Sequence, residues 1–267
     1  MVSDKIREIV NRRKNSISCD KEFGRNFNQE IRQNNKTSVS KAIKKNKGIS
    51  IISEIKPASP TLGHIKKNIN VKETAMLMES SNVIGLSILT EPNYFNGSYL
   101  NLKLAIENTK LPCLMKDFVV DPIQFFIANQ LGATNILIIN AIENQILENY
   151  YELAIKYNLE PLIEIHDINE IADIKHLFEI GYTPKLIGVN NRNLNTLNIN
   201  LNTSKKIIPV LKQEFGEDIQ IISESGINSN NDIKELLPYG TNAFLIGSSI
   251  MQSDDIKKKI LQLRGVI

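Results

Sequence analysis

The sequence is short of cysteine and histidine and has no long apolar run, and each shortage excludes a class of protein. Its 267 residues include two cysteines, Cys19 and Cys113, which cannot build a disulfide framework and which fit a reducing compartment. The three histidines, His64, His166 and His176, are scattered, so a zinc site is poorly supplied with ligands. No run approaches the roughly 20 apolar residues that span a bilayer. A disulfide-stapled or membrane-spanning protein is therefore excluded, and we expect no metal site.

A strong excess of charge of one sign is also missing. Lys and Arg number 32 against 29 Asp and Glu, and a formal charge of +3 is too weak a bias to indicate nucleic-acid binding. The N-terminal stretch MVSDKIREIVNRRKN is polar and lacks the apolar core of a signal peptide. We therefore expect a cytoplasmic protein, a monomer or homodimer, that has no nucleic-acid or membrane partner. The 42% hydrophobic content is enough to bury a core.

The length allows two small domains or one large α/β barrel, and the pattern of apolar runs favours the barrel. Eight short runs rich in β-branched residues recur, each followed by a helical pattern, as parallel strands buried on both faces require. The runs are residues 49–56, 83–90, 112–118, 135–140, 161–166, 186–190, 219–225 and 243–247. Eight strand–helix repeats with no strand left over predict an α/β fold, a (β/α)8 TIM barrel, in preference to a doubly wound sheet.

The segment before the first strand has no strand of its own. Residues 1–48 read as helical and basic, and we expect an N-terminal helical extension packed on the barrel. Residues 49–267 then form the catalytic barrel, and the whole is a single domain. The alternative is a loose basic tail over about the first 20 residues. Two of the expected amphipathic helices cover residues 143–158 and 168–181, the second ending in a glycine.

Charged and polar residues end most of the expected strands. They are Glu54, Lys56, Lys116, Glu164, Asn190, Arg192 and Glu224. Active sites of such barrels lie at the C-terminal face of the strands, and unpaired buried charges are too costly to be kept for stability. We therefore expect these side chains to converge on one mouth, where burial and neighbouring charges shift their pKa values. The alternative is that each charge simply ends its strand in solvent.

Two glycine–serine turns predict a phosphate site at the same mouth. The seventh run leads into Ser225-Gly226 and the eighth into Gly247-Ser248. Barrels often bind phosphate between the loops after these two strands, where glycine lets backbone N–H groups approach the oxygens.

Arg192 is the only arginine between Arg32 and Arg264, and its planar fork suits a carboxylate or a phosphate. The loop over residues 57–63 is rich in turn formers and is a candidate lid.

Seven segments, taken together, resemble the hallmark segments of the indole-3-glycerol phosphate synthase family of tryptophan biosynthesis. They are SEIKPASPTLG, SILTEPNYFNGS, LMKDFVVDPIQ, LIEIHD, IGVNNRNL, ISESGI and FLIGSSIM, and they cover residues 49–251 or so. The resemblance implies ring closure, decarboxylation and dehydration of 1-(2-carboxyphenylamino)-1-deoxyribulose 5-phosphate, giving indole-3-glycerol phosphate, carbon dioxide and water. It also implies a lyase that uses no cofactor and no metal, and a sugar-phosphate substrate with an anthranilate moiety.

The resemblance also implies roles for individual residues. Lys116 looks like the general acid, Glu164 and Lys56 like the remaining acid/base pair, Glu54 like the partner of the lysines, and Glu224 like a group that supports catalysis and binds substrate hydroxyls. Which lysine makes which proton transfer is left open. The expected substrate contacts are Asn190, Arg192, Phe118, Leu137, Ser59 and Ser225, and the expected phosphate contacts are Ser59, Gly226, Gly247 and Ser248. His166 is expected to lie behind these groups or in a loop, and Cys113 to be a buried thiol.

The sequence departs from the family pattern at two places. Asn193 stands where the family usually has an aspartate, and Pro57-Ala58 where many members have a further lysine. Three other interpretations stay open on the sequence alone: the neighbouring isomerase of the same pathway, a Schiff-base aldolase, and a catalytically silent sugar-phosphate binder on the same barrel. The intact set of charged strand ends favours an enzyme over the silent binder.

Overall fold

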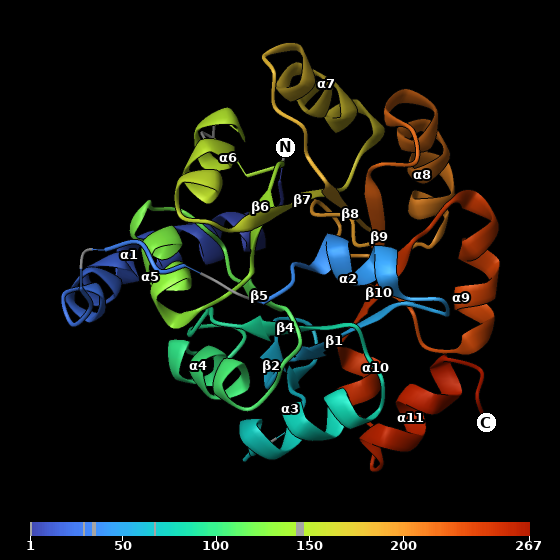
Figure 1. Cartoon of the computed structure of the whole chain (residues 1–267), viewed down its shortest axis with the longest axis horizontal. Helices are drawn as coiled ribbons and strands as arrows, with labels where there is room; N and C mark the ends of the chain where they lie inside the picture. Colours follow the sequence, from blue (N-terminus) through green and yellow to red (C-terminus); the bar gives the residue numbers. More distant parts are fainter. Residues whose placement is uncertain (1, 29, 34–35, 67, 143–146) are drawn as a thin grey trace.

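The computed structural model describes residues 2–28, 30–33, 36–66, 68–142 and 147–267, and in them eight parallel strands close into a barrel with helices around it (Figure 1). The barrel strands are β1 (Ile51–Ile55), β4 (Gly85–Leu89), β5 (Cys113–Lys116), β6 (Asn135–Ile139), β7 (Glu160–Ile165), β8 (Leu186–Asn190), β9 (Gln220–Glu224) and β10 (Ala243–Ile246). Going round the barrel, the order is β1, β10, β9, β8, β7, β6, β5, β4. The predicted (β/α)8 barrel is confirmed, and each strand lies within one residue of an expected run.

Helices follow the strands around the outside of the barrel (Figure 1). They are α3 (Val71–Ser80), α4 (Tyr99–Glu107), α5 (Ile123–Leu131), α6 (Leu147–Lys156), α7 (Ile171–Glu179) after the short η1 (Ile168–Glu170), α8 (Asn202–Phe215), α9 (Asn230–Leu236) with η2 (Leu237–Tyr239), α10 (Ser248–Met251) and α11 (Ile256–Leu263). The expected helix over 143–158 corresponds to α6, although residues 143–146 lie outside the described residues. The expected helix over 168–181 corresponds to η1 and α7, and Gly181 follows its end with a φ of +96°.

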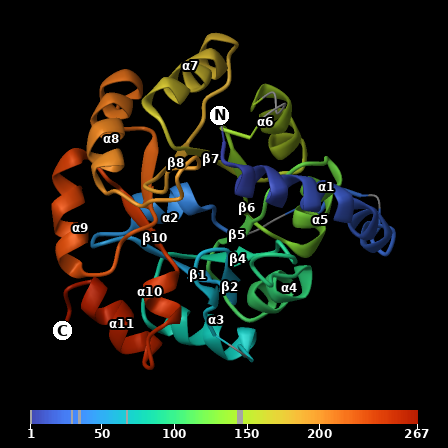
Figure 2. The same cartoon turned by 180° about the vertical axis from the view of Figure 1, so that it is seen from behind.

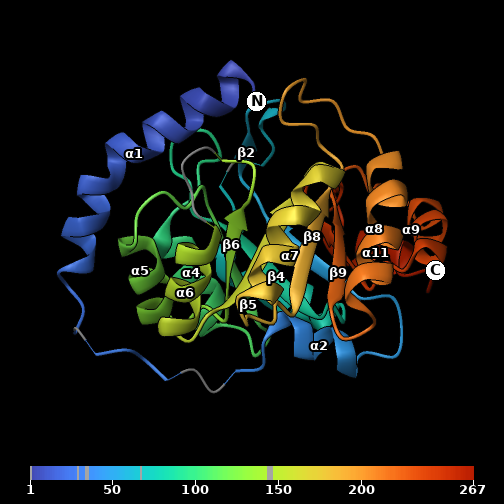
Figure 3. The same cartoon turned by 90° about the horizontal axis from the view of Figure 1, so that it is seen from above.

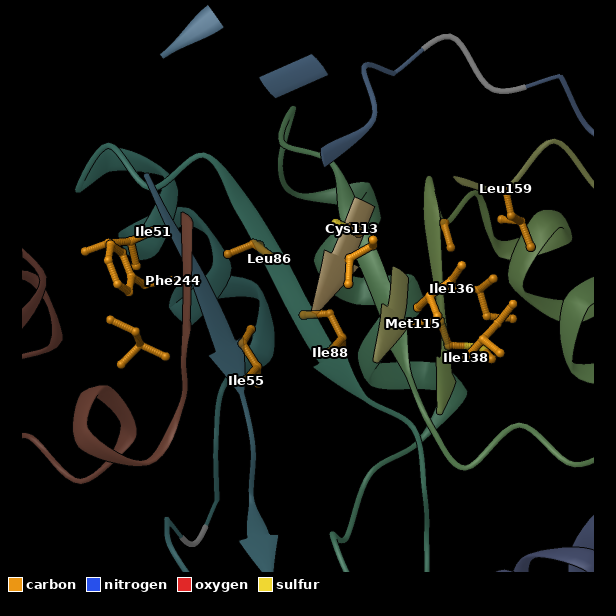
Figure 4. Close-up of a cluster of buried hydrophobic side chains, with 14 of the residues drawn as sticks. Ile51, Ile55, Leu86, Ile88, Cys113, Met115, Ile136, Ile138, Leu159 and Phe244 are labelled. Carbon is orange, nitrogen blue, oxygen red and sulfur yellow. The ribbon is translucent and has the colours of Figure 1, made fainter. Parts of the chain in front are cut away.

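Successive residues of each barrel strand point alternately outward and inward. Outward side chains pack against the helices, and Figure 4 shows part of this layer, including Ile51, Met115 and Ile136. Inward neighbours such as Ile52 and Leu114 belong to a second apolar cluster inside the barrel. Because both faces of each strand are apolar over most of their length, the strands read as continuous apolar runs in the sequence. Towards the C-terminal ends of the strands, the inward positions become polar.

Two helices precede the barrel and lie at its opposite ends (Figure 3). The first, α1 (Asp4–Gly24), crosses the end where the barrel strands point, as the view from behind also shows (Figure 2). The second, α2 (Val39–Lys45), closes the other end, where Val39 packs with the inward residues of the strand starts. Here the Glu160 carboxylate accepts hydrogen bonds from the backbone N–H of Ser40 at 3.0 Å and from Asn135 Nδ2 at 2.8 Å. Hydrogen bonds thus fasten residues 38–40 beneath the barrel.

The loop after β1 contains a small antiparallel hairpin of β2 (Ala58–Ser59) and β3 (Gly63–His64). We expected a loop rich in turn formers there, as a candidate lid; the two short strands were not expected, because two-residue strands carry no periodic signal. Among the described residues, no helix has the length and apolar character needed to cross a membrane.

Candidate active site

The polar inward residues line one pocket at the C-terminal end of the barrel, between the strand ends and α1. Of the expected site residues, those lining it are Glu54, Lys56, Ser59, Lys116, Phe118, Leu137, Glu164, Asn190, Arg192, Glu224, Ser225, Gly247 and Ser248. Gly226 does not line this pocket and follows Ser225 directly, with a φ of +85°. The alternative that the charges end their strands in solvent is wrong, since the carboxylates of Glu54, Glu164 and Glu224 are buried.

Lys116 lies at the centre of the charged cluster, between two carboxylates. Its ammonium group donates to Glu164 Oε2 at 2.9 Å and to Glu224 Oε2 at 3.0 Å. Lys116 ends β5, whereas Glu164 and Glu224 come from β7 and β9, and all three side chains occupy inward positions. The even spacing of inward residues on parallel strands brings these three groups together.

A second ion pair lies beside the first on β1. Lys56 Nζ is 2.7 Å from Glu54 Oε1, and the hydroxyl of Ser87 on β4 lies 3.4 Å from Glu54 Oε2. Glu54 and Lys56 are two residues apart and therefore face the same side of the strand, as their spacing predicts. The charged cluster formed by these two sets of ion pairs thus contains two ammonium groups and three carboxylates.

Burial and neighbouring charges set distinct protonation states in this cluster. Burial alone would lower the pKa of Lys116, but the carboxylates of Glu164 and Glu224 hold that pKa above its ordinary value. Burial opposes the ionisation of Glu164, yet Lys116 and the nearby His166 hold the pKa of Glu164 well below its ordinary value. Burial raises the pKa of Glu224 to about 8, and the charge of Glu164 adds to this effect while Lys116 opposes it. Near neutral pH the cluster therefore has an ionised Glu164, a charged Lys116 and a protonated Glu224.

The shifted pKa of Glu224 predicts how stability depends on pH. Because this pKa is about 8 in the folded protein and 4.5 ordinarily, its contribution to stability is full below pH 4.5 and is lost as the pH rises through about 8. We expect the melting temperature of the wild type to fall between roughly pH 5 and pH 8 more steeply than that of Glu224→Gln, which copies the neutral acid at every pH. Thermal denaturation followed by circular dichroism measures both slopes. Equal slopes would show that Glu224 is already ionised at neutral pH.

His166 packs directly against Glu164 from the end of β7. Its Nε2 lies 3.1 Å from Glu164 Oε1, and both side chains are about 5% exposed or less. Glu164 is therefore approached by Lys116 at one oxygen and by His166 at the other. The histidine does not line the pocket, in agreement with the expectation that it lies behind the reacting groups.

An apolar slot borders the charged cluster. Phe118 on the β5 side and Phe95 after β4 face each other, with ring centroids 6.2 Å apart. The buried carboxylate of Glu91 orders the turn before Phe95, because it accepts hydrogen bonds from the backbone N–H groups of Asn93, Tyr94 and Phe95. Such a slot suits a flat aromatic ring.

Several lining residues were not predicted from the sequence. They are Lys5, Ile6, Ile9, Pro60, Thr61, Leu89, Glu91, Phe95, Asp117, Ile139, Leu194, Leu197 and Leu245. For Leu89, Ile139 and Leu245 a signal existed, since each is the inward apolar residue nearest the end of its strand. For Lys5, Ile6 and Ile9 there was none, because the sequence does not show where α1 docks.

Arg192 lies at the rim of the pocket and is half-buried. Its Nη1 donates to the carbonyl of Leu197 at 2.9 Å, and its backbone N–H donates to Asn190 Oδ1 at 3.0 Å. No carboxylate forms an ion pair with Arg192 in the described part of the chain, and Arg192 lines the pocket. This arrangement leaves the guanidinium available to an anionic ligand.

The arrangement of possible metal ligands and the environment of the buried cysteine bear on two other kinds of chemistry. Within the described ranges, no group of three or more His, Cys, Asp and Glu side chains is arranged to hold a metal ion. Cys113 is fully buried on the outward face of β5, where burial raises the pKa of its thiol to about 12. A thiol with that pKa stays protonated and is a poor nucleophile.

Comparisons with known proteins point to one family. A family model described as "Indole-3-glycerol phosphate synthase" matches residues 3–263. Indole-3-glycerol phosphate synthase of Methanocaldococcus jannaschii is 39% identical over 255 residues, covering 94% of this chain and 92% of that protein. The same-named protein of Aquifex aeolicus is 33% identical over 261 residues, covering 97% and 98%.

A solved structure, the thiamine phosphate pyrophosphorylase from Pyrococcus furiosus, superimposes with a TM-score of 0.59 at 16% identity, covering 83% of this chain and 96% of that one, which shows the shared fold alone. On the match to the family model and the two full-length relatives, this chain belongs to the indole-3-glycerol phosphate synthase family.

Proposed function

We propose that the protein catalyses the family reaction, in which 1-(2-carboxyphenylamino)-1-deoxyribulose 5-phosphate closes to indole-3-glycerol phosphate with loss of carbon dioxide and water. Family membership supports the overall reaction. The site supports it with one observation above all: the Lys116 ammonium lies between Glu164 and Glu224, beside the Lys56–Glu54 pair and an apolar slot. We propose that residues 49–267 form the catalytic barrel, which contains these groups. Residues 1–48 form an extension that packs on the barrel.

We assign ring closure to Lys116. The ring carbon that bears the carboxylate attacks the ribulose carbonyl carbon, and the electron pair of the C=O bond moves to oxygen. Lys116 donates its proton to that oxygen as the charge develops. The raised pKa of Lys116 keeps the ammonium charged until this moment, and a developing alkoxide is basic enough to take the proton.

We assign the later steps to the remaining charged groups. Loss of carbon dioxide moves the electrons of the C–C bond toward the nitrogen, which carries positive charge after ring closure. Dehydration then needs an acid for the leaving hydroxyl and a base for the departing proton. Lys56 is suited to the first task and the ionised Glu164 to the second, and Glu54 holds Lys56 in place at 2.7 Å.

We assign the substrate's two ends to two sides of the pocket. We place the anthranilate ring in the apolar slot of Phe118 and Phe95, beside Leu137, and its carboxylate at Arg192, next to Asn190. The phosphate fits the turn residues after β9 and β10, where Ser225, Gly247 and Ser248 line the pocket beside Ser59, with Gly226 next to them. The protonated Glu224 has a buried Oε1 without a partner among the described residues, and it is suited to a substrate hydroxyl.

A negative charge at the phosphate end tests this orientation. Ser248→Asp is expected to raise KM for the substrate about tenfold or more with a smaller effect on kcat, because a carboxylate repels the phosphate dianion. Steady-state kinetics measure both constants. Gln252→Glu is the matched control, since it adds the same charge at an exposed position four residues along the chain. An unchanged KM in Ser248→Asp would place the phosphate elsewhere.

The direct test of the reaction is a fluorescence assay. Purified protein, treated with a chelator and given the carboxyphenylamino-ribulose phosphate, is expected to form the indole product without added metal. Absence of product at saturating substrate would refute the proposed function.

A Schiff-base aldolase on the same barrel is the main rival, and it needs an unprotonated lysine as nucleophile. The raised pKa of Lys116 argues against that role. Borohydride treatment with a carbonyl substrate is expected to leave Lys56 and Lys116 unlabelled, and covalent labelling of either would favour the aldolase.

A further inference from the structure

Arg13 on α1 is a fully buried guanidinium outside the acid/base cluster. It is 1% exposed, although it lies on a surface helix. Its Nε and Nη2 donate to the two oxygens of Asp117 at 2.9 and 3.1 Å. Nη2 also donates to Asp20 Oδ2 at 2.5 Å and to the Tyr99 hydroxyl oxygen at 3.0 Å, while Nη1 donates to Ser16 Oγ at 3.0 Å. Each nitrogen of the guanidinium thus has a defined partner.

Asp117 connects this network to the active site because it directly follows Lys116 in the chain. Side chains alternate along an extended segment, so Lys116 points to Glu164 and Glu224, while the carboxylate of Asp117, at the edge of the same pocket, is turned to Arg13 on α1. Thr90, at the end of the neighbouring β4, donates to Asp117 Oδ2 at 2.7 Å, and its backbone N–H donates to the carbonyl of Lys116 at 3.0 Å. The end of β5 is therefore held from α1 on one side and from β4 on another.

Stability alone does not account for this arrangement. Removing one guanidinium and two carboxylates from water is costly, and apolar side chains of similar volume often stabilise a protein as well or better. Burial would lower the pKa of Arg13, but the carboxylates of Asp117 and Asp20 hold it above its ordinary value, so the charge is retained. A two-pronged contact between a planar fork and a carboxylate fixes direction as well as distance. The contact between Arg13 and Asp117 therefore fixes the position and direction of Asp117.

We propose that Arg13 is a positioning residue of the active site: through Asp117 it fixes the end of β5 so that the Lys116 ammonium stays between Glu164 and Glu224. The inference rests on the role assigned to Lys116 under the proposed function. Arg13 also belongs to the same buried stripe of α1 as Ile6 and Ile9, which line the pocket. The contact between Arg13 and Asp117 therefore sets the position of Ile6 and Ile9 at the pocket and also the direction of the Lys116 side chain.

Two variants of Arg13 and one control test the proposal. Arg13→Met keeps most of the apolar stem and leaves Asp117 with a buried, unpaired charge, whereas Arg13→Lys keeps the charge and loses the fork. We expect kcat to fall about 10- to 100-fold in Arg13→Met and by less in Arg13→Lys, because a displacement of about 1 Å at a reacting group has effects of this size. Ile17→Ala is the control, since Ile17 is buried on the same helix and hydrogen-bonds to neither Asp117 nor Lys116. It is expected to lower the melting temperature and to leave kcat within about threefold of wild type.

The outcomes distinguish a role of Arg13 in positioning Lys116 from a role in anchoring α1 alone. If Arg13→Met and Arg13→Lys both retain the kcat of Ile17→Ala, Arg13 only anchors α1 and the proposal is overturned. A crystal structure of Arg13→Lys gives a readout that does not depend on activity: Lys116 Nζ is expected to leave at least one of its two carboxylates. Both contacts retained at their present 2.9 and 3.0 Å would overturn the positioning role even if the proposed reaction were wrong.

Discussion

Lys116→Met is expected to lower kcat by about 10²- to 10⁴-fold, the range that loss of a positioned general acid produces. Methionine keeps an unbranched stem of similar length and removes the ammonium that lies between Glu164 and Glu224. Without that charge, the buried Glu164 loses the main group that keeps it ionised, and it will take up a proton beside the already protonated Glu224. The variant therefore loses the acid and also the ionised state of Glu164. Steady-state turnover of the carboxyphenylamino-ribulose phosphate measures the loss.

Lys5→Met is the matched control for this prediction. Lys5 also lines the pocket, but it comes from α1 and pairs with the exposed Glu8 at 3.1 Å. We expect its kcat to stay within a few fold of wild type, because a partly exposed pair contributes little. Far-ultraviolet circular dichroism and binding of a product analogue test whether Lys116→Met is folded and still binds; both are expected to match the wild type. Near-normal turnover in Lys116→Met would remove the lysine from the mechanism.

Gly188→Ala is expected to lower kcat about 10- to 100-fold although the added group is one methyl. Gly188 is the inward residue of β8 next to the catalytic cluster, and a Cβ there would overlap Glu224 Oε1 and lie 3.3 Å from Leu162 Cδ1. Glu224 is fully enclosed and must turn away from the methyl group, which takes its carboxylate off Lys116. We expect a large fall in kcat and only a small fall in the melting temperature. The added methyl group overlaps the side chain of Glu224, and no backbone atom of β8 has to move.

Gly85→Ala provides the control for a methyl group added to a barrel strand. Gly85 begins β4, far from the mouth, and a Cβ there would lie 3.4 Å from Pro112 Cγ and 3.6 Å from Val39 Cγ2. These are close to ordinary contacts, so turnover should be unchanged. If both alanine variants turn over substrate equally well, Gly188 does not reserve the space that Glu224 occupies.

The barrel and the acid/base cluster could be predicted because their signals are local. Each strand is apolar on both faces, and the change to polar inward residues at Glu54, Lys116 or Glu164 is visible within one short run. Gly188 and Phe95 were missed although their segments were recognised, because their importance depends on which side chain lies opposite.

A packed N-terminal helix was expected, but the place where α1 docks could not be predicted, because its contacts are distant in sequence. Arg13 and Asp117 are 104 residues apart, and an arginine among many basic residues on a surface helix carries no signal of burial. The helical spacing of the apolar residues in α1 did carry a signal. Arg13 lies on the same face of the helix as Ile6, Ile9 and Ile17, which indicates that this face is buried.

The attachment of α2 beneath the barrel has a consequence for α1 at the opposite end. Hydrogen bonds to Glu160 hold residues 38–40 in place, so α1 is joined by residues 25–38 to an anchored point of the same molecule. Docking of α1 is then an intramolecular event, with an effective concentration of about millimolar for a tether of this length. Because α1 is part of the same chain, its docking on the barrel does not depend on protein concentration. Diluting the protein therefore leaves the α1 residues in place at the pocket.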